Sequence, residues 1–203
     1  MKIAVAGASG NAGSRIVTEL ACRGHTVTAI VRHPEKIAGQ PNVTAKQGDV
    51  LDQAGLAALF AGHDVAISSV HFLDSDPVRL IGAARDSKVG RYLVVGGAGS
   101  LEVAPGVRLV TTPNFPVVYK AEAEKGGAFL DLLRQEKELN WTLLSPSALF
   151  TAGERTGKFR LGTDQLLTAS DGKSWISFED FAVALADEIE RPAHSRQRFT
   201  VGY

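Results

Sequence analysis

The chain has 203 residues, of which 44% are hydrophobic, and its 22 basic residues balance 22 acidic ones to a formal net charge of zero. This length suits one α/β domain over residues 1–203, and no shift in composition marks a boundary. A neutral chain offers no basic surface for nucleic acid or an anionic membrane, so neither is expected as a partner. The single cysteine, Cys22, excludes an intramolecular disulfide framework and a cysteine-based zinc site, and no metal site is predicted.

The sequence shows no targeting or membrane-spanning signal. The first predicted strand starts directly after Met1 and Lys2, and its apolar run is too short for a signal peptide. No run reaches the roughly 18 apolar residues that a spanning helix needs. We therefore expect a cytoplasmic protein that is a monomer or a homodimer.

A glycine-rich turn follows a short apolar strand at residues 3–6. Gly7, Gly10 and Gly13 form this turn, and a helical pattern runs from about Asn11 to just before Gly24. In such turns the first glycine permits the tight bend, the second lets the backbone approach a pyrophosphate, and the third allows close helix packing. Free N–H groups and the positive dipole end of the helix favour phosphate. The order of strand, turn and helix predicts a dinucleotide-binding βαβ unit, whereas a plain structural turn is the alternative.

Arg32 follows the second predicted strand, residues 25–31, and lies about 20 residues beyond the last glycine of the turn. At this distance NAD enzymes carry an acidic residue that binds the ribose 2′-hydroxyl, whereas an arginine suits the 2′-phosphate of NADP. A guanidinium holds phosphate through two parallel hydrogen bonds. Arg32 therefore predicts NADP(H) as the preferred cofactor, with NAD(H) as the alternative. The alternative interpretation of Arg32 itself is a solvated surface arginine without a ligand.

The rest of the chain continues the alternation of strands and helices without a repeat or a linker. Three prolines make residues 101–116 look like a long irregular loop, and residues 147–177 are predicted to form a small segment on the substrate side. The remaining predicted elements are strands at 42–48, 63–71, 91–95, 141–145 and 198–201 and helices at 53–61, 76–88, 119–138 and 177–190.

Candidate site residues gather where the strands end, because ligands of open α/β sheets bind outside the carboxyl ends of the strands. Asp49 lies after the third strand, where an adenine ring would rest, although Asp49 or Asp52 could instead cap the next helix. Hydroxyl groups and an imidazole follow the fourth strand, at residues 68–71. Glycines follow the fifth strand, at residues 96–99, and would let the backbone lie against a flat ring.

Several of these motifs together resemble the atypical short-chain dehydrogenase/reductase superfamily, and most closely its NAD(P)-binding NmrA-like and NADH-flavin reductase group. The resemblance covers essentially the whole chain and rests on GASGNAG at 7–13, Arg32, GDV at 48–50, GGAGSL at 96–101 and WTLLSP at 141–146. It implies an α/β Rossmann fold, with a doubly wound parallel sheet in strand order 3-2-1-4-5-6 and helices on both faces.

The chain departs from this superfamily in its catalytic pair. Most short-chain dehydrogenases use Tyr-x-x-x-Lys, in which the lysine lowers the pKa of the tyrosine for proton exchange with an alcohol or ketone. Tyr119 begins the corresponding helix, but Ala123 stands four residues later. The expected serine or threonine after the fifth strand is replaced by Gly97 or Ala98, and Ser100 lies slightly beyond. Carbonyl reduction and sugar epimerisation need this machinery, whereas hydride transfer to a flavin or quinone depends mainly on stacking geometry.

Three functions remain open from the sequence. The first is an NAD(P)H-dependent reductase of flavins, quinones or similar conjugated acceptors, in which the flavin is a substrate rather than a bound cofactor. The second is a non-catalytic NAD(P) sensor that resembles the NmrA regulators. The third is a nucleotide-sugar epimerase or dehydratase, for which the small C-terminal segment leaves little room.

These inferences define two sets of site residues. The predicted cofactor set is Gly7, Ser9, Gly10, Asn11, Ala12, Gly13, Arg32, Asp49, Val50, Ser68, Ser69, Val70, Gly96, Gly97, Ser145, Pro146 and Ser147. The predicted catalytic set is Tyr119, His71 and Ser100, which would shape the acceptor site or donate a hydrogen bond. The alternative interpretations are a half-buried aromatic at a helix start for Tyr119 and an ordinary loop histidine for His71.

Overall fold

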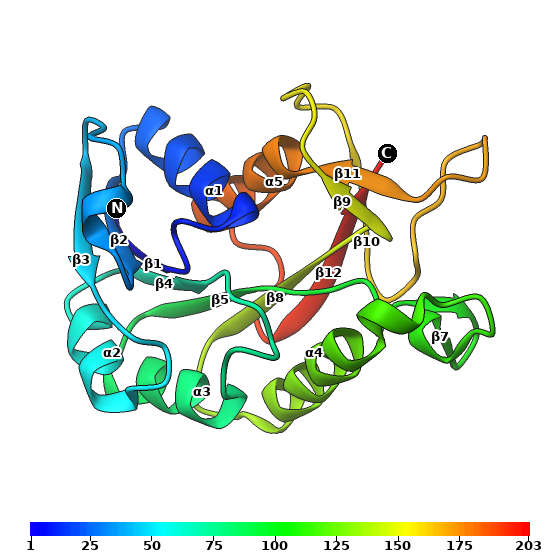
Figure 1. Cartoon of the computed structure of the whole chain (residues 1–203), viewed down its shortest axis with the longest axis horizontal. Coiled ribbons are helices and arrows are strands. Elements are labelled where there is room, and N and C mark those ends of the chain that lie inside the picture. Colours follow the sequence, from blue (N-terminus) through cyan, green and yellow to red (C-terminus); the bar gives the residue numbers. More distant parts are fainter.

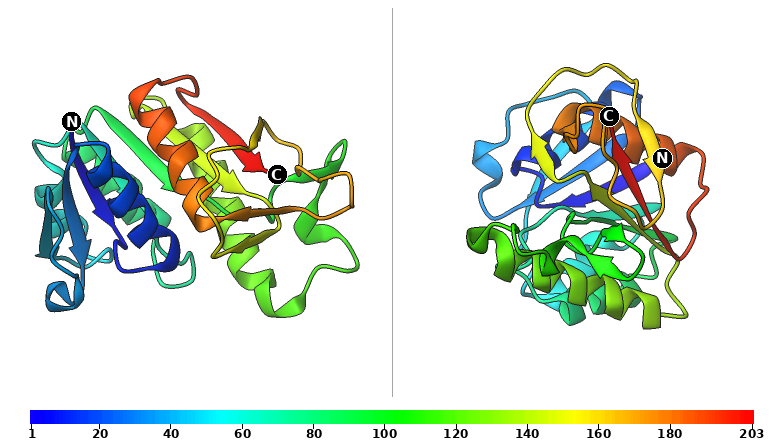
Figure 2. Two further views of the ribbon diagram at one scale, coloured as in Figure 1. Left: turned by 90° about the horizontal axis from the view of Figure 1, so that it is seen from above. Right: turned by 90° about the vertical axis from the view of Figure 1, so that its right-hand side faces the viewer.

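A computed structural model describes the whole chain, residues 1–203. An eight-stranded sheet lies between two layers of helices, as Figure 1 and the right-hand view of Figure 2 show. Helices α1 (Asn11–Cys22) and α5 (Phe178–Glu190) cover one face of the sheet. Helices α2 (Gln53–Phe60), α3 (Pro77–Asp86) and α4 (Val117–Gln135) cover the other.

The main sheet has the predicted Rossmann order and extends it by two strands. From one edge to the other its strands are β10 (Arg160–Gly162), β12 (Gln197–Gly202), β8 (Trp141–Pro146), β5 (Arg91–Val95), β4 (Val65–Ser68), β1 (Lys2–Ala6), β2 (Thr26–Val31) and β3 (Val43–Gln47). Because β8 is the sixth strand of this sheet along the chain, the order 3-2-1-4-5-6 is confirmed. All pairs are parallel except β10 with β12.

Two hydrophobic cores fill the spaces between the sheet and its helices. One joins α1 and α5 to the sheet through residues such as Ile16, Phe181 and Phe199. The other joins α2, α3 and α4 to the opposite face through residues such as Phe60 and Phe129. With both faces covered, the central strands are mostly apolar, as expected for parallel sheets.

Short polar residues cap the starts of three helices. Ser177 Oγ accepts a hydrogen bond from Asp180 N at 2.9 Å, and Asp52 Oδ1 accepts one from Gly55 N at 3.0 Å. Asp76 caps α3 in the same way. The helix α1 stops at Gly24, whose φ of +83° is readily adopted only by glycine.

The prediction that residues 101–116 form an irregular loop is wrong. It contains the hairpin of β6 (Glu102–Ala104) and β7 (Val107–Arg108), joined through Pro105 and Gly106, and a short 3₁₀ turn at Leu109–Thr111. Strands of two or three residues are too short to produce an alternating pattern. The Pro-Gly pair is the one sequence signal of the turn.

Helix α4 and the segment that follows β8 also differ in detail from the prediction. The helix begins at Val117, two residues earlier than expected, and it ends at Gln135 because Glu136 is extended. In the segment 147–177, β9 (Leu149–Thr151) pairs in parallel with β11 (Trp175–Ser177), while β10 joins the main sheet. No helix combines the length and the apolar character needed to cross a membrane.

Candidate functional site

The predicted glycine turn forms a tight cradle between β1 and α1. Gly7 has a φ of +79°, and a Cβ atom at this position would lie 2.1 Å from the Ser69 carbonyl oxygen. A Cβ atom on Gly13 would lie 2.2 Å from the Gly7 carbonyl oxygen. Both contacts involve backbone, which cannot swing away, so side chains are excluded at Gly7 and Gly13. Gly10 donates its N–H to the Gly7 carbonyl at 3.1 Å and closes the turn.

The N-terminus of α1 is open toward this cradle. Ser14 N donates the first intrahelical bond, to the Gly10 carbonyl at 2.9 Å, so the N–H groups of Asn11, Ala12 and Gly13 come before the helical ladder. No side chain caps this end, and its first turn has no acidic residue. The helices α2, α3 and α5, in contrast, are each capped by the side chain of the residue that directly precedes the helix. The uncapped end with its glycine cradle fits the pyrophosphate of a dinucleotide.

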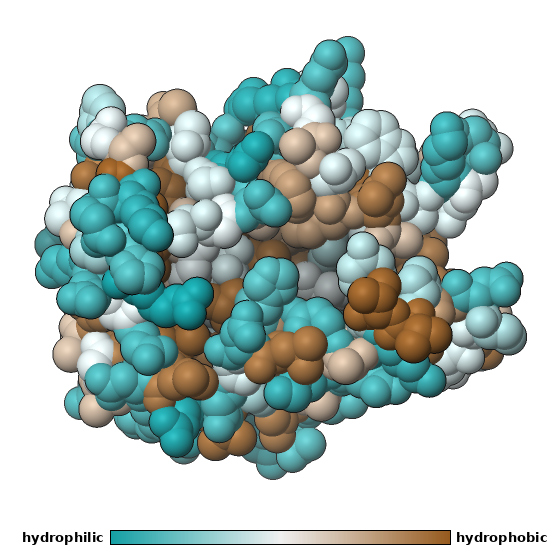
Figure 3. Space-filling view, in the orientation of Figure 1, coloured by the Kyte–Doolittle hydropathy of each residue, from teal (hydrophilic) through white to brown (hydrophobic).

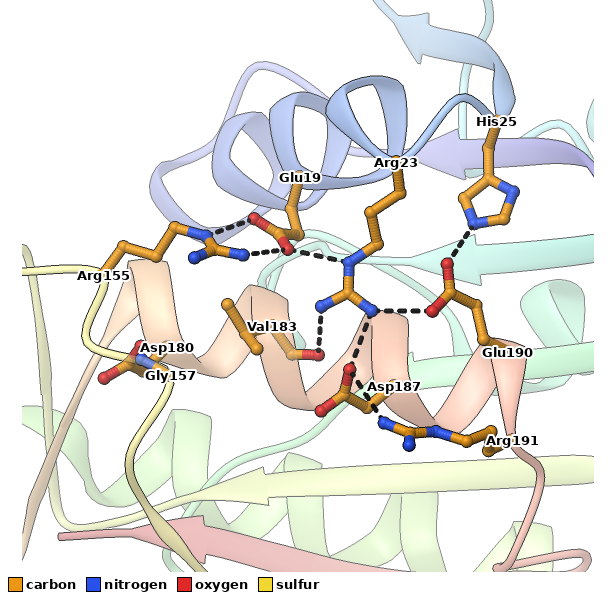
Figure 4. A network of polar contacts seen from close by, with 10 residues as sticks. All are labelled: Glu19, Arg23, His25, Arg155, Gly157, Asp180, Val183, Asp187, Glu190 and Arg191. Carbon is orange, nitrogen blue, oxygen red and sulfur yellow. Dashed lines mark hydrogen bonds and ion pairs between the residues drawn. The ribbon is translucent and has the colours of Figure 1, made fainter.

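A network of ion pairs on its outer side holds α1 against α5 (Figure 4). Glu19 is buried and receives two hydrogen bonds of 2.8 Å from Arg155 and one of 2.8 Å from Arg23. Arg23 also binds Asp187 at 2.7 Å and Glu190 at 2.8 Å on α5. The hydrogen bonds from Arg155 lower the pKa of Glu19, while burial acts in the opposite direction. This network fixes the helix that carries the cradle.

The adenine side of the predicted site lies at the ends of β2 and β3. Arg32 is exposed directly after β2, and its guanidinium forms no hydrogen bond or ion pair within the chain. Asp49 is also exposed, but its Oδ1 already accepts the Leu51 N–H at 2.9 Å. Val50 is half-buried against the core, and Asp52 rather than Asp49 caps α2.

The predicted serines of the central strands present mainly backbone to the site. Ser68 Oγ is buried and lies 2.8 Å from the hydroxyl of Tyr92, whose pKa is raised by burial. Ser147 Oγ donates to the Val201 carbonyl at 3.0 Å. Ser145 Oγ is buried without a partner. The hydroxyls of Ser68, Ser145 and Ser147 therefore point into the protein, which corrects the expectation that side-chain hydroxyls gather at the site.

Ser69 and Val70 lie beside the cradle, and the glycines after β5 lie next along the same edge. The Ser69 carbonyl and a Val70 methyl group both contact Gly7. Gly96 is enclosed by Leu143, so a side chain there would collide at 2.4 Å. Gly97 has open space, with the Phe72 ring as its nearest neighbour.

The three predicted catalytic residues differ in their exposure to solvent. Tyr119 is exposed near the start of α4, and Ala123, one turn later, packs against Gly99. His71 is exposed in the loop after β4. Ser100 is buried under α4, where its Oγ accepts a hydrogen bond of 3.3 Å from Arg198 Nη1. The structure therefore keeps Ser100 away from the open edge, which is a correction to its predicted role.

Glu122 is a site residue that the sequence prediction missed. It lies on α4 and accepts the N–H groups of Phe72 and Leu73 at 2.7 and 2.8 Å. The same carboxylate approaches His71 Nδ1 at 3.5 Å. About 50 residues separate the partners, so no local pattern in the sequence indicates this contact.

Apolar side chains are exposed on both sides of the predicted acceptor end. Figure 3 shows a hollow across this face, with hydrophobic surface beside it over the beginning of α4. Val117 and Val118 in the first turn of α4 are 85% and 80% exposed, and Leu149 on β9 is 59% exposed. Like α1, α4 starts without a side-chain cap. The apolar surface at the predicted acceptor end of the site suits a flat apolar ring better than a sugar.

Comparisons with known proteins agree with this geometry. The family described as NAD(P)H-binding matches residues 7–192. The uncharacterised protein YwnB of Bacillus subtilis is 41% identical over 99% of this chain and 98% of its own length. A Bacteroides thetaiotaomicron structure that is provisionally named an epimerase is 40% identical, with a TM-score of 0.95 over 100% of this chain and 96% of that one. A Streptococcus pneumoniae structure that carries the provisional name NADH-flavin reductase is 35% identical, with a TM-score of 0.83 over 100% and 99% of the two chains.

Proposed function

Because this chain belongs to the family of NAD(P)H-binding proteins, we propose that it is a reductase that transfers hydride from NADPH to a flavin, a quinone or a similar conjugated acceptor. The bound dinucleotide supplies the hydride. The cradle at Gly7, Gly10 and Gly13 holds its pyrophosphate through backbone N–H groups. Arg32 binds the 2′-phosphate, which makes NADP(H) the preferred cofactor over NAD(H).

The observation that carries this proposal is the replacement of the Tyr–Lys pair. Ala123 is packed against Gly99, so no amine stands one turn after Tyr119 to lower its pKa. Electron-poor rings accept hydride without this pair when they are held against the nicotinamide. The exposed apolar surface of Val117, Val118 and Leu149 supplies such a holding surface. The provisional flavin reductase name of the Streptococcus relative agrees with this choice of acceptor.

A non-catalytic NAD(P) sensor is the second candidate, since it would equally dispense with the Tyr–Lys pair. An epimerase or dehydratase is disfavoured because the site offers no proton-transfer pair in that position, although one relative carries an epimerase name. The cytoplasmic location and the monomeric or homodimeric state stay predictions.

The test is oxidation of NADPH by purified protein, with FMN, riboflavin and a small quinone offered separately and NADH run in parallel. We expect turnover with at least one of these acceptors and a preference for NADPH, both measured from the loss of NADPH absorbance. Tight NADPH binding without turnover above background would contradict the reductase and favour the sensor. Failure to bind either dinucleotide would contradict both functions.

A further inference from the structure

The loop after β4 is held rigidly while its histidine side chain stays free. The carbonyl of His71 accepts hydrogen bonds from Asp74 N at 3.2 Å and from Ser75 Oγ at 2.9 Å. The next two backbone N–H groups are both bound by the Glu122 carboxylate. Four hydrogen bonds thus fix the backbone around His71, yet its side chain is 83% exposed. A fixed backbone beneath an open imidazole is suited to presenting that ring to a ligand.

This loop crosses the edge of the sheet between the cradle and the glycines after β5. At one end the Ser69 carbonyl contacts Gly7. At the other, the Phe72 ring packs over Gly97 and against Gly126 of α4. His71 therefore lies between the pyrophosphate cradle and Gly97, at the edge of the sheet where the predicted cofactor residues gather.

The Glu122 carboxylate that holds the loop also lies beside the imidazole. Its Oε1 lies 3.5 Å from His71 Nδ1, and the carboxylate itself is immobilised by the two backbone N–H groups. A carboxylate on the Nδ1 side of a histidine pairs with an Nδ1–H, which leaves Nε2 directed away from that carboxylate. A proton donated by this ring therefore leaves from Nε2, in the form of the ring that carries a proton on both nitrogens.

We propose that His71 is the proton donor to a carbonyl oxygen of the acceptor and that Glu122 is the residue that positions it. The inference rests on the proposed reductase function and names quinones and conjugated carbonyl compounds as the acceptors whose reduction uses a proton from the protein. As hydride from NADPH reaches the acceptor, the Nε2–H bond of His71 breaks and an O–H bond forms on the acceptor oxygen. Hydride and proton together complete the two-electron reduction, and solvent returns the proton to His71.

Flavins provide the internal control, because hydride transfer to the flavin ring yields a reduced anion without a proton from the protein. His71→Asn should lower kcat with a small quinone by about 10²-fold, the scale of general acid catalysis, and leave kcat with FMN unchanged. Glu122→Gln should lower kcat with the quinone by roughly tenfold, since it keeps an oxygen for the loop but loses the charge. The KM for NADPH should stay the same in both variants, because neither side chain is placed in the cradle.

Asp74→Asn is the matched control, because its exposed carboxylate lies in the same loop and takes part in none of these contacts. It should behave like the unchanged protein with both acceptors. Equal losses with quinone and FMN, or no loss with either, in a protein that reduces both would overturn the proton-donor role and leave the reductase function standing. A raised KM for NADPH in Glu122→Gln with unchanged kcat would overturn its positioning role. An unchanged protein that reduces no acceptor would overturn the reductase function and this inference together.

Discussion

At the end of β2, the Arg32 side chain reaches solvent without a carboxylate to neutralise it. A 2′-phosphate would give it a charged partner, and hydrogen bonds between charged groups contribute about 1.5–3 kcal/mol each. Arg32→Ala should therefore weaken NADPH binding by roughly 10- to 100-fold and NADH binding much less. Titration of both dinucleotides by fluorescence measures the two dissociation constants. Lys36→Ala, a neighbouring exposed cation, is the control, and equal losses for the two dinucleotides would refute the 2′-phosphate assignment.

Single residues could be predicted where the backbone alone decides their identity. Gly7 and Gly13 have no room for a Cβ atom, and their spacing after a strand indicates this in the sequence. The orientation of the Ser68 and Ser147 hydroxyls could not be predicted. Both faces of a parallel sheet are buried, so the alternation of residues does not show which side chains face the ligand edge. Glu122 could not be found either, since its contacts come from a loop distant in the chain.

At the scale of elements, the pairing of α1 with α5 depends on the buried carboxylate of Glu19. Glu19→Gln should lower the free energy of unfolding at neutral pH by about 1–3 kcal/mol, because charge-assisted hydrogen bonds from Arg155 and Arg23 are weakened. Urea unfolding of the two proteins measures the difference. Asp171→Asn is the control, since that carboxylate is exposed and pairs only within its own turn.

The same pair makes a prediction about pH. Arg155 holds the pKa of Glu19 below its usual value, so the ionised carboxylate contributes stability above the pKa of the unfolded chain. This contribution disappears as the pH falls through the lowered pKa of the folded state. The difference in unfolding free energy between the protein and Glu19→Gln should therefore shrink as the solution is acidified. A difference that stays constant across this range would show that Glu19 acts through packing rather than charge.

Helices and strands were predictable where a local signal matched a buried face. Caps such as Ser177 and Asp52 follow from side-chain oxygens placed just before an apolar pattern. The start of α4 was missed because Val117 and Val118 are exposed and lie outside the apolar stripe of the helix. The hairpin of β6 and β7 was missed because its few pairs depend on neighbours distant in the chain. The Asp164 carbonyl accepts the Glu102 N–H, and no local pattern in the sequence indicates this contact.

For the whole molecule, the alternation of strands and helices predicted a parallel α/β sheet, whereas the strand order came from the resemblance to the dehydrogenase/reductase superfamily. The strand at 198–201 was predicted, and the structure places it beside β8 as β12, whereas β10 was beyond this reasoning. β10 is short and runs antiparallel, and only its pairing with β12 brings the segment 147–177 into the main sheet. Its integration therefore arises from tertiary contacts rather than from a local pattern.

These connections make the whole chain a candidate for one cooperative unfolding transition. The core on the α1 side contains Ile3 near one end of the chain, Ile176 in the segment 147–177 and Val201 near the other end.

Two tryptophans report on different parts of the molecule. Trp141 is buried in β8, and Trp175 packs on Tyr203 with ring centroids 4.4 Å apart. Since all these elements share buried surface, tryptophan fluorescence and far-ultraviolet circular dichroism should give the same urea midpoint. In Trp175→Phe, where Trp141 alone reports, fluorescence and circular dichroism should again coincide. An earlier fluorescence transition that Trp175→Phe abolishes would show instead that the segment 147–177 unfolds independently of the sheet.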